Sequence, residues 1–571
     1  MEKDERLAQL RTTYLVPDNH GASDYFSLIR ELLNYKESDP AVQTHIHQIY
    51  SLVEDEIISN QGVPVNEINF GTSGWRGILG KDVFKKSVRA VTEAIVDLYR
   101  MAETDPALHP HLGLTSINEA RRRGCLVGWD NRFGGEILGR CVADTLVEHG
   151  FKVYFCGEST TGVLSASLLE LKAAFSINLT PSHNPLDYGG YKFNAADGGP
   201  AASELTTIIT QKARERIKNT AGTEVRQVTE RGELVETDSL ALWQRLVDNN
   251  KEVHRIDYRA LLEKVSAHSD IAIVIDSVHG ASRLHIKRLL GPAAVHLEHL
   301  RGESDVTFGG IAPEPSSENM SEVTQRLQAC SKQLRIGAII DPDADRIRFT
   351  DGDTEISMNQ FGAMAYHFLH EYKKLSGMVA KTVATSNLAN SVAATLGEEL
   401  YETRVGFKEF KPVIGKALVY FEESDGISVI GHTPEKDAYI GLLLALDMVI
   451  TTGLNLGGIK QEMDRKYGEY YPERDGVAVS LKGEPLLTAL ASLQKYDVGT
   501  AVMVGDTEKT IKEIITKDGR KMIFEDDSWL MIRPSGTEPK VRFYVESRDP
   551  GGTADLVEAA RIMLLEAGLL D

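Results

Sequence analysis

Three carboxylates stand at alternate positions in DPDADR, residues 341–346, directly after an apolar run. In an extended loop, Asp341, Asp343 and Asp345 can converge on one point. A small set of oxygen ligands suits Mg²⁺, which keeps its other positions for water or a phosphate oxygen, whereas Ca²⁺ takes more ligands. An Asp-rich turn has the same composition. The segment therefore predicts a candidate magnesium site.

One hydroxyl lies between two prolines in LTPSHNP, residues 179–185. Because the prolines have fixed φ angles, they would hold the Ser182 hydroxyl in a defined place. A serine needs a neighbouring base or a metal to act as a nucleophile, and His183 and Lys192 are candidates for the proton transfers. An ordinary turn is the alternative interpretation.

A third segment, RPSGTEPKVRFYVE at residues 533–546, combines small donors with basic side chains. Glycine lets backbone N–H groups approach an anion, hydroxyls add donors, and arginine supplies a two-pronged fork. Such a segment can wrap a phosphate, although a turn before a strand would look the same. The predicted phosphate-binding residues are Arg533, Ser535, Gly536, Thr537 and Arg542.

Two further segments carry weaker signals. FGTSGWRG, residues 70–77, joins glycines with Thr72, Ser73 and Arg76. FEESDG, residues 421–426, offers Glu422 and Ser424 as partners for sugar hydroxyls, and a solvated turn is its alternative. By contrast, VGWDNRFGG at 127–135 is interpreted as mainly structural, with Asp130 and Arg132 paired to brace a loop.

The elements that must position these residues alternate between strands and helices. Four apolar runs rich in β-branched residues predict strands at 125–130, 152–157, 271–276 and 335–341, and helix-like segments follow them. This alternation predicts an α/β fold. Each run ends in Gly, Asp or Asn, at the edge where open parallel sheets bind ligands.

The chain of 571 residues exceeds the size of a single hydrophobic core, so several domains are expected. Polar and Gly-rich breaks predict boundaries near residues 250, 350 and 456. The predicted domains are 1–250, 251–350, 351–456 and 457–571, the last a small α+β unit with strands and a helix near 554–567. Residues 1–45 are assigned a helical packing role.

Composition excludes some classes of partner. A net charge of −20 disfavours binding to nucleic acid or to an anionic membrane. No apolar run approaches the ~20 residues that cross a bilayer, and 440–450 is expected to be a buried helix. The charged N-terminus predicts no secretion signal, which favours a cytoplasmic location. Four cysteines at no metal-ligand spacing are expected to be reduced core residues.

Together, a hydroxyl nucleophile, a magnesium loop, a phosphate loop and a hydroxyl-binding loop indicate phosphoryl transfer on a sugar phosphate. FGTSGWRG, TPSHNP, DPDADR, EES and RPSGTEPKVR occur in the order seen in the α-D-phosphohexomutase family, which the chain resembles from about residue 70 to 546. With GGYKFNAADGGPA at 189–201, the serine segment looks most like that of bacterial phosphoglucomutases.

The resemblance implies three related α/β domains with mixed sheets and a smaller C-terminal α+β domain, all around a central active-site cleft. It implies a phosphorylated Ser182 whose phosphate completes Mg²⁺ coordination with the three aspartates. A phosphohexomutase of this kind converts glucose 1-phosphate to glucose 6-phosphate through glucose 1,6-bisphosphate, which also acts as the activator. The other residues it implicates in catalysis or substrate binding are Thr72, Ser73, Arg76, His183, Lys192, Arg346, Glu422, Ser424, Lys436, Arg533, Ser535, Gly536, Thr537 and Arg542.

The sugar loop departs from the family, since many members that use both mannose and glucose have Gly before and Gly-His after EES. FEESDG therefore disfavours dual use of mannose. The prediction is a phosphoglucomutase, acting on a small-molecule sugar phosphate as a monomer or homodimer. A glucose 1,6-bisphosphate synthase, a phosphomannomutase or a phosphopentomutase is the alternative within enzymes. A non-catalytic sugar-phosphate-binding protein is the alternative outside them, and the intact site residues argue against it.

Overall fold

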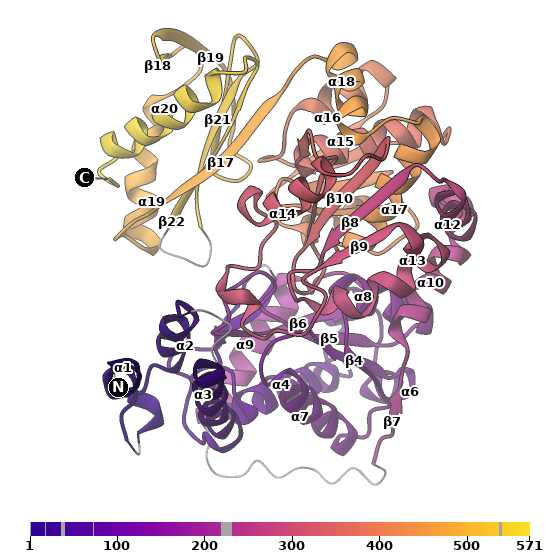
Figure 1. Cartoon of the computed structure of the whole chain (residues 1–571). Coiled ribbons are helices and arrows are strands. Elements are labelled where there is room, and N and C mark those ends of the chain that lie inside the picture. The colour runs from indigo at the N-terminus through magenta and orange to yellow at the C-terminus, as the bar shows by residue number, and fades with distance from the viewer. Residues whose placement is uncertain are drawn as a thin grey trace.

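The computed structural model describes residues 2–17, 19–35, 40–71, 73–218, 231–535 and 540–570. Four β-sheets follow one another along the chain (Figure 1). Sheets of seven, five and four strands, each mixing parallel and antiparallel pairs, precede a six-stranded antiparallel sheet. The predicted fold class is thereby confirmed.

The first sheet has the strand order β1-β2-β6-β5-β3-β4-β7. Its strands are β1 Phe70–Gly71, β2 Gly74–Ile78, β3 Cys125–Trp129, β4 Val153–Glu158, β5 Phe175–Leu179, β6 Tyr188–Ala195 and β7 Leu234–Glu236. β3, β4, β5 and β7 run parallel, and β6 returns antiparallel to β5. The strands predicted at 125–130 and 152–157 are therefore confirmed.

Helices bury both faces of this sheet, because successive side chains of a strand point to opposite faces. In β3, Val127 belongs to the apolar cluster of α4 (Lys85–Met101) and α7 (Gly135–Glu148). Its neighbour Leu126 packs instead with α8 (Thr161–Leu171). A fully buried parallel strand needs no polar alternation, and all five residues of β3 are buried.

The second and third sheets repeat this plan on a smaller scale, with orders β12-β11-β10-β8-β9 and β14-β13-β15-β16. The second comprises β8 Ile271–Asp276, β9 Leu297–Leu300, β10 Leu334–Ile340, β11 Ile347–Thr350 and β12 Glu355–Ile356. The third comprises β13 Val379–Thr382, β14 Leu400–Thr403, β15 Val419–Glu422 and β16 Gly426–Val429. Between them, α17 (Ala438–Thr452) is buried in the core, as expected for 440–450.

Each of these three sheets contains one hairpin in which a strand paired to a parallel neighbour is followed by an antiparallel strand. The hairpins are β5–β6, β10–β11 and β15–β16. Their connecting loops carry the serine, aspartate and sugar-loop segments singled out from the sequence. The three predicted site segments therefore occupy equivalent hairpin loops in three similar units.

The fourth sheet lies apart from the others and is covered by α19 (Gly483–Ala491) and α20 (Gly552–Glu566) (Figure 1). Its order is β17-β22-β21-β20-β19-β18. The strands are β17 Tyr471–Ala478, β18 Ala501–Val504, β19 Thr507–Ile515, β20 Arg520–Phe524, β21 Trp529–Pro534 and β22 Lys540–Ser547. This arrangement matches the small α+β unit expected at the C-terminus.

In the described residues, three α-helices precede the first sheet: α1 Glu2–Tyr14, α2 Tyr25–Leu33 and α3 Pro40–Ser59. Their apolar side chains share one buried cluster with the helices and strands of the first domain. Phe308, at the start of the short helix η5 (Phe308–Gly310) of the second domain, belongs to the same cluster. The N-terminal helices therefore contact two domains.

The expectation for the cysteines holds only in part. Of the four cysteines, all free thiols, Cys125 is buried, but Cys141, Cys156 and Cys330 are half-buried, so the prediction of core residues holds only for the first. No single helix in the described ranges is long and apolar enough to span a membrane. Taken together, α17 and α18 (Leu456–Tyr467) have the length and apolar composition of a membrane span, but they are bent by 78° relative to each other. Only length and composition favour that interpretation.

Candidate active site

Ser182 lies in the β5–β6 loop in a left-handed backbone conformation, with φ of 56°. This region is unfavourable for a residue with a side chain, so surrounding contacts must hold it. The Thr180 hydroxyl oxygen accepts the Ser182 N–H at 2.8 Å and donates to Asp130 at 2.7 Å. Arg132 donates to the carbonyls of Ser182 and Pro185, each at 2.6 Å. The predicted bracing role of Asp130 and Arg132, 3.5 Å apart, is confirmed.

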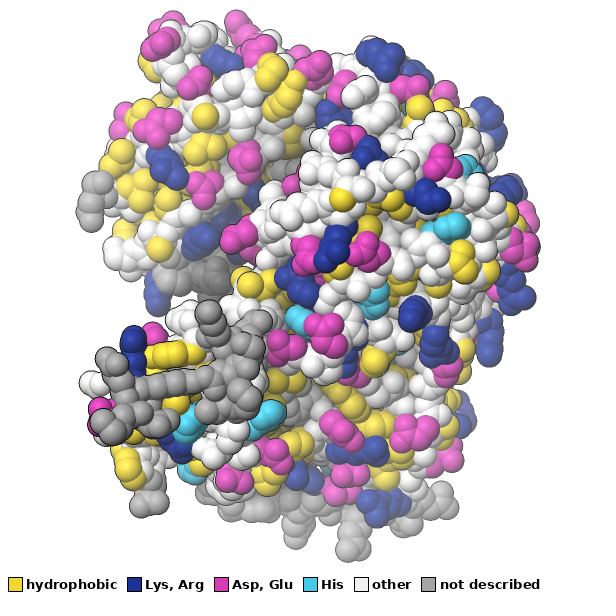
Figure 2. All heavy atoms as spheres, in the orientation of Figure 1, with side chains coloured by type: hydrophobic (Ala, Val, Ile, Leu, Met, Phe, Trp, Pro, Cys, Tyr) yellow, Lys and Arg dark blue, Asp and Glu magenta, His cyan; other side chains and the backbone are white. Residues whose placement is uncertain are grey.

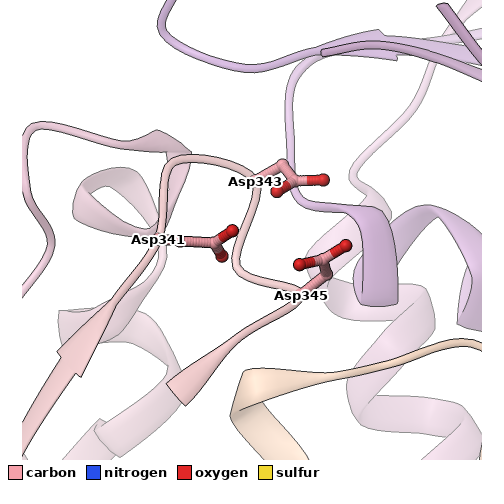
Figure 3. A group of neighbouring side chains, drawn as sticks. All are labelled: Asp341, Asp343 and Asp345. Atoms are coloured by element: carbon pink, nitrogen blue, oxygen red, sulfur yellow. The ribbon is translucent and has the colours of Figure 1, made fainter. Parts of the chain in front are cut away.

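Asp341, Asp343 and Asp345 point toward one another from the β10–β11 loop (Figure 3). One oxygen from each lies within 4.8 Å of the others, and all three residues are buried. Ala344 takes a left-handed φ of 50°, which turns the loop between the second and third carboxylates. Three buried carboxylates repel one another unless cations offset their charge.

The serine faces this triad across the boundary between the first and second domains. The Ser182 hydroxyl donates to Asp341 Oδ2 at 3.0 Å, and its oxygen lies 3.5 Å from Asp345 Oδ1. Asp343 Oδ1 is buried and has no hydrogen-bond partner among the described residues. A hard divalent cation would satisfy this unpartnered oxygen and could also bind oxygens of Asp341, Asp345 and Ser182. These four residues can therefore hold such a cation.

Two lysines reach the triad from other domains. Lys192 on β6 contacts Asp343 at 2.6 Å and Asp345 at 2.7 Å. Lys436, in the loop before α17, lies 3.3 Å from both Asp345 and Glu422. Both lysines are buried. The third-domain lysine thus links the sugar-loop glutamate to the aspartate loop.

The buried charges shift the pKa values of two triad carboxyls in opposite directions. Burial, with the nearby charges of Asp345 and Asp343, holds the pKa of Asp341 well above its usual value. Burial acts in the same direction on Asp345, but Lys192 and Lys436 outweigh it and lower the pKa of that carboxyl well below its usual range. For Lys192, burial opposes the charge, and Asp343 and Asp345 nevertheless raise its pKa.

His183 and Arg76 lie beside the serine. Nδ1 of His183 is 3.4 Å from the Ser182 hydroxyl oxygen. Burial, followed by the charges of Arg346 and Arg76, lowers the pKa of His183 well below its usual value, so the ring is neutral at pH 7. Arg76 donates to the Asn184 side chain at 2.6 Å and thereby contacts the serine loop directly.

The sugar loop is tied to the aspartate loop. Asp425, with φ of 70°, accepts from Arg348 Nη2 at 2.8 Å, and its carbonyl accepts the Ile347 N–H at 2.9 Å. Glu422 is buried against Lys436, and Ser424 is half-buried. Arg346 follows the triad, with its Nε 3.7 Å from Asp345.

Two residues in this arrangement escaped sequence reasoning. Thr161 donates to Asp343 and lies 3.3 Å from Lys192 Nζ. It begins α8 just after β4, so the polar run after the predicted strand at 152–157 was an available signal. Arg348 lies on β11, where its pairing with a residue far along the chain leaves no local pattern.

The predicted phosphate loop lies in the fourth domain. Arg533 is 3.4 Å from Asp518, the Ser535 N–H donates to the Lys540 carbonyl at 2.8 Å, and Arg542 is exposed. Thr72, Gly536 and Thr537 lie outside the described residues. The structure brings the serine, aspartate and sugar loops together, and Ser73 lines a small cavity with Lys192. No hydrogen bond or ion pair joins Arg533 or Ser535 to these loops among the described positions.

The surface is drawn inward between the C-terminal domain and the N-terminal helices (Figure 2). On this face, acidic and basic side chains are interspersed rather than segregated, and basic side chains lie at the edge of the hollow. Interspersed charges are screened over about 8–10 Å in physiological salt, so the net negative charge does not exclude an anionic ligand there.

Family profiles match the chain in four consecutive blocks. The α/β/α domains I, II and III of phosphoglucomutase/phosphomannomutase match residues 67–220, 253–354 and 357–467. The C-terminal domain of the same family matches residues 478–562.

Full-length relatives are similar at low identity. A phosphoglucomutase/phosphomannomutase of Thermococcus kodakarensis is 24% identical, with 88% of this chain and 99% of that protein covered. A phosphoglucosamine/phosphogalactosamine mutase of Sulfurisphaera tokodaii is 23% identical, with 86% and 97% covered. The open form of the Paramecium phosphoprotein pp63/parafusin, a phosphoglucomutase, shares the fold with a TM-score of 0.67 at 20% identity, with 89% and 98% covered.

Proposed function

This chain belongs to the α-D-phosphohexomutase family, and on that premise we propose that it interconverts glucose 1-phosphate and glucose 6-phosphate. The reaction would pass through a phosphoserine enzyme and glucose 1,6-bisphosphate. The observation that carries the proposal is the Ser182 hydroxyl 3.0 Å from Asp341, at the mouth of three buried carboxylates. A serine beside carboxylates that can bind a cation is well placed to carry a phosphoryl group.

In the first half-reaction, the bond between phosphorus and Ser182 Oγ breaks and a bond to the free sugar hydroxyl forms. The sugar hydroxyl loses a proton and Ser182 Oγ takes one up, and the His183 ring, 3.4 Å from Ser182 Oγ, is proposed to relay the proton at the serine. After the bisphosphate turns over, the other phosphoryl group returns to Ser182 and the proton moves in the opposite direction. Arg76, Arg346, Lys192 and Lys436 are proposed to stabilise the oxygens that gain charge.

Mg²⁺ is the cation proposed for Asp341, Asp343, Asp345 and the phosphorylated Ser182, and when bound it offsets the charge on the transferring group. The chain's own contribution is to preset the ligands. Lys192 holds Asp343 and Asp345 at 2.6 and 2.7 Å, and Arg346 N–H donates to Asp341 Oδ1 at 3.0 Å.

Sugar recognition is proposed for Glu422 and Ser424, whose oxygens pair with hydroxyls. The phosphate that does not react is proposed to bind Arg533, Ser535 and Arg542, together with Gly536 and Thr537, while Thr72 and Ser73 contact the substrate from the first domain. Binding energy from this remote phosphate can align the reacting end. Relatives at similar identity are named for several sugars, so their names do not select one substrate. The proposed preference for glucose therefore rests on FEESDG and on the serine segment.

The test is a substrate panel. Glucose, mannose, glucosamine and ribose 1-phosphates are assayed for conversion to their terminal phosphates, with Mg²⁺ and a trace of the matching bisphosphate, with and without chelator. The proposal expects glucose 1-phosphate to give the highest kcat/KM and chelator to abolish turnover. A higher kcat/KM for another sugar overturns the glucose assignment, and net release of bisphosphate from an added phosphoryl donor favours the synthase alternative.

A further inference from the structure

We propose that the N-terminal helices α2 and α3 position the Ser182 loop, with Tyr50 and Arg30 as the positioning residues. The proposal rests on the proposed role of Ser182 as the phosphoryl carrier. The helices span residues 25–33 and 40–59 and precede the region matched by the family profiles, which begins at residue 67. Their function is therefore not covered by the family assignment.

The first contact runs through the loop that holds the serine. The ring of Tyr50, on α3, lies 4.4 Å from that of Phe133, next to Arg132 in the chain. Nearby, a Cβ added to Gly134 would stand 2.8 Å from Ile57 of α3, so helix and loop are in close contact. Because Arg132 donates to the Ser182 carbonyl, α3 supports the serine through this loop.

The Tyr50 hydroxyl is buried and has no hydrogen-bond partner among the described residues. Burial raises the pKa of this phenol, and the charges of Asp305, Arg132, Asp187 and Arg30 act on it. A neutral phenol therefore sits among the charged groups of α2, the serine loop and the second domain. Its ring, not an ionised oxygen, supplies the support.

The second contact joins α2 to the far end of the serine loop. Arg30 forms an ion pair with Asp187, which directly precedes β6. The arginine is 43% exposed at its side chain, so solvent screens the pair and it contributes little to stability by itself. Its value is geometric, because it fixes the loop at the end opposite Thr180.

The third contact reaches Arg132 from the second domain. The Arg132 guanidinium lies 4.6 Å from the centre of the Phe308 ring. Phe308 is buried in the same cluster as α2, and Leu33 at the end of α2 comes within 3.5 Å of a Cβ built on Gly310 of η5. The helices thus support Arg132 both through its own loop and through η5.

These contacts matter because the left-handed backbone of Ser182 is unfavourable and persists only where neighbours hold it. When the support weakens, the loop relaxes and the hydroxyl moves from Asp341. Misplacement by 1 Å can lower a rate by about 10²-fold. Binding of the sugar by Glu422 and Ser424 in the third domain, and of the remote phosphate by the fourth domain, would be little affected.

The variants are Tyr50→Ala, Tyr50→Phe and Arg30→Gln in the full chain, with Arg11→Gln as the control. Tyr50→Phe keeps the ring and removes only the unpartnered hydroxyl, so it tests rescue. Arg11 donates to Gln48 at 2.7 Å and lies 3.2 Å from His45, so it contacts α3 without reaching the serine loop. Arg30→Gln alters a half-exposed side chain and keeps the test available where Tyr50→Ala fails to fold.

The first measurement is hydrogen–deuterium exchange of the segment 180–187, which requires no turnover. Faster exchange is expected in Tyr50→Ala and Arg30→Gln, and wild-type exchange in Tyr50→Phe and Arg11→Gln. The second is kinetics: kcat is expected to fall about tenfold in Tyr50→Ala and two- to threefold in Arg30→Gln, with KM within twofold of wild type.

Unchanged exchange at 180–187 in the folded Arg30→Gln and Tyr50→Ala proteins overturns the proposal, whatever the activity. An equal fall of kcat in Arg11→Gln overturns it as well, because the effect would then be one of general stability. Absence of glucose 1-phosphate turnover in the wild type contradicts the proposed function instead, and the exchange data still decide whether the helices position the loop.

Discussion

Two buried lysines, at two different domain junctions, have opposite electrostatic environments. Lys192, where the first and second domains meet, lies 2.6 and 2.7 Å from two carboxylates that raise its pKa. Lys521, where the fourth domain meets the third, donates to the Val383 carbonyl at 2.9 Å and lies 3.8 Å from the Trp529 ring centre. Burial and the charge of Lys381 lower its pKa to about 7.

The difference teaches that burial alone does not set the charge of a lysine. Carboxylates at the first junction outweigh desolvation, whereas the Val383 carbonyl, the Asn387 side-chain oxygen at 3.3 Å and the Trp529 ring face at the second do not. Glu402 and Glu546 partly offset Lys381 at the second junction. The first junction can therefore hold cations, whereas burial at the second favours the neutral form of Lys521.

Loss of one triad carboxylate should have the largest effect. Asp343→Asn keeps the volume but removes a charge from the candidate metal site, and kcat is expected to fall about 10³-fold or more. Initial rates in saturating Mg²⁺ measure it. Asp351→Asn is the control, because Asp351 is also buried but holds backbone N–H groups near Gly457. Equal losses in both variants would deny the triad a special role.

The same substitution at both lysines tests the comparison directly. Lys192→Met should lower kcat about 10²-fold, since the buried carboxylates lose their cation. Lys521→Met should leave kcat within about threefold, because a methionine satisfies an apolar ring face. Initial rates of both folded proteins decide it. Comparable kcat values in the two variants would mean that Lys192 contributes no more to catalysis than Lys521.

Removal of the exposed Arg542 in the predicted phosphate loop should have a smaller, selective effect. Arg542→Ala is expected to raise the KM for sugar phosphate about tenfold with little change in kcat, because a charged hydrogen bond to phosphate is lost. Arg561→Ala is the control, because Arg561 on α20 forms an ion pair with Asp475 on β17 at 2.9 Å. Unaltered KM in Arg542→Ala would remove this residue from the phosphate site.

The smallest effect is one of pH on stability. The pKa of Lys521 is about 7 in the folded chain and about 10.4 when unfolded, so the unfolded chain binds more protons between these values. Stability therefore rises with pH across this window, by at most about 1.4 kcal/mol per unit from this group.

Urea unfolding of wild type and Lys521→Met at pH 7 and pH 8.5 measures this linkage. Relative to the variant, the wild type should be about 1–2 kcal/mol more stable at the higher pH than at the lower. The groups facing this lysine, namely Lys381, Glu402, Glu513 and Glu546, remain in both proteins, so their contributions cancel. Parallel pH dependence in the two proteins would contradict the lowered pKa.

Local patterns were enough to predict the strands at 125–130, 152–157, 271–276 and 335–341, which correspond to β3, β4, β8 and β10. DPDADR and LTPSHNP stand at strand ends, where a parallel sheet presents its ligands, so the meeting of Ser182 with Asp341 could be anticipated from the sequence and the family resemblance. The pairing of Asp130 with Arg132 could likewise be predicted, because both residues lie in one short loop.

Contacts between distant segments could not be predicted, because they depend on how whole domains pack. Arg348 and Asp425 are separated by 77 positions, and no periodicity links them. The left-handed φ of Ser182 has no signature in a Pro-Ser-His sequence. The N-terminal helices looked like simple packing elements, and only the structure reveals Tyr50 against Phe133.

The central claim is that Ser182 carries the phosphoryl group. Wild type and Ser182→Ala are incubated with glucose 1,6-bisphosphate and Mg²⁺, freed of ligand, and digested to locate phosphate, and the loaded protein is then given glucose 1-phosphate. The expected result is phosphate on Ser182 alone, its transfer to the sugar, and no turnover by Ser182→Ala. Turnover by Ser182→Ala, or phosphate on another residue that is transferred to the sugar, would contradict the claim.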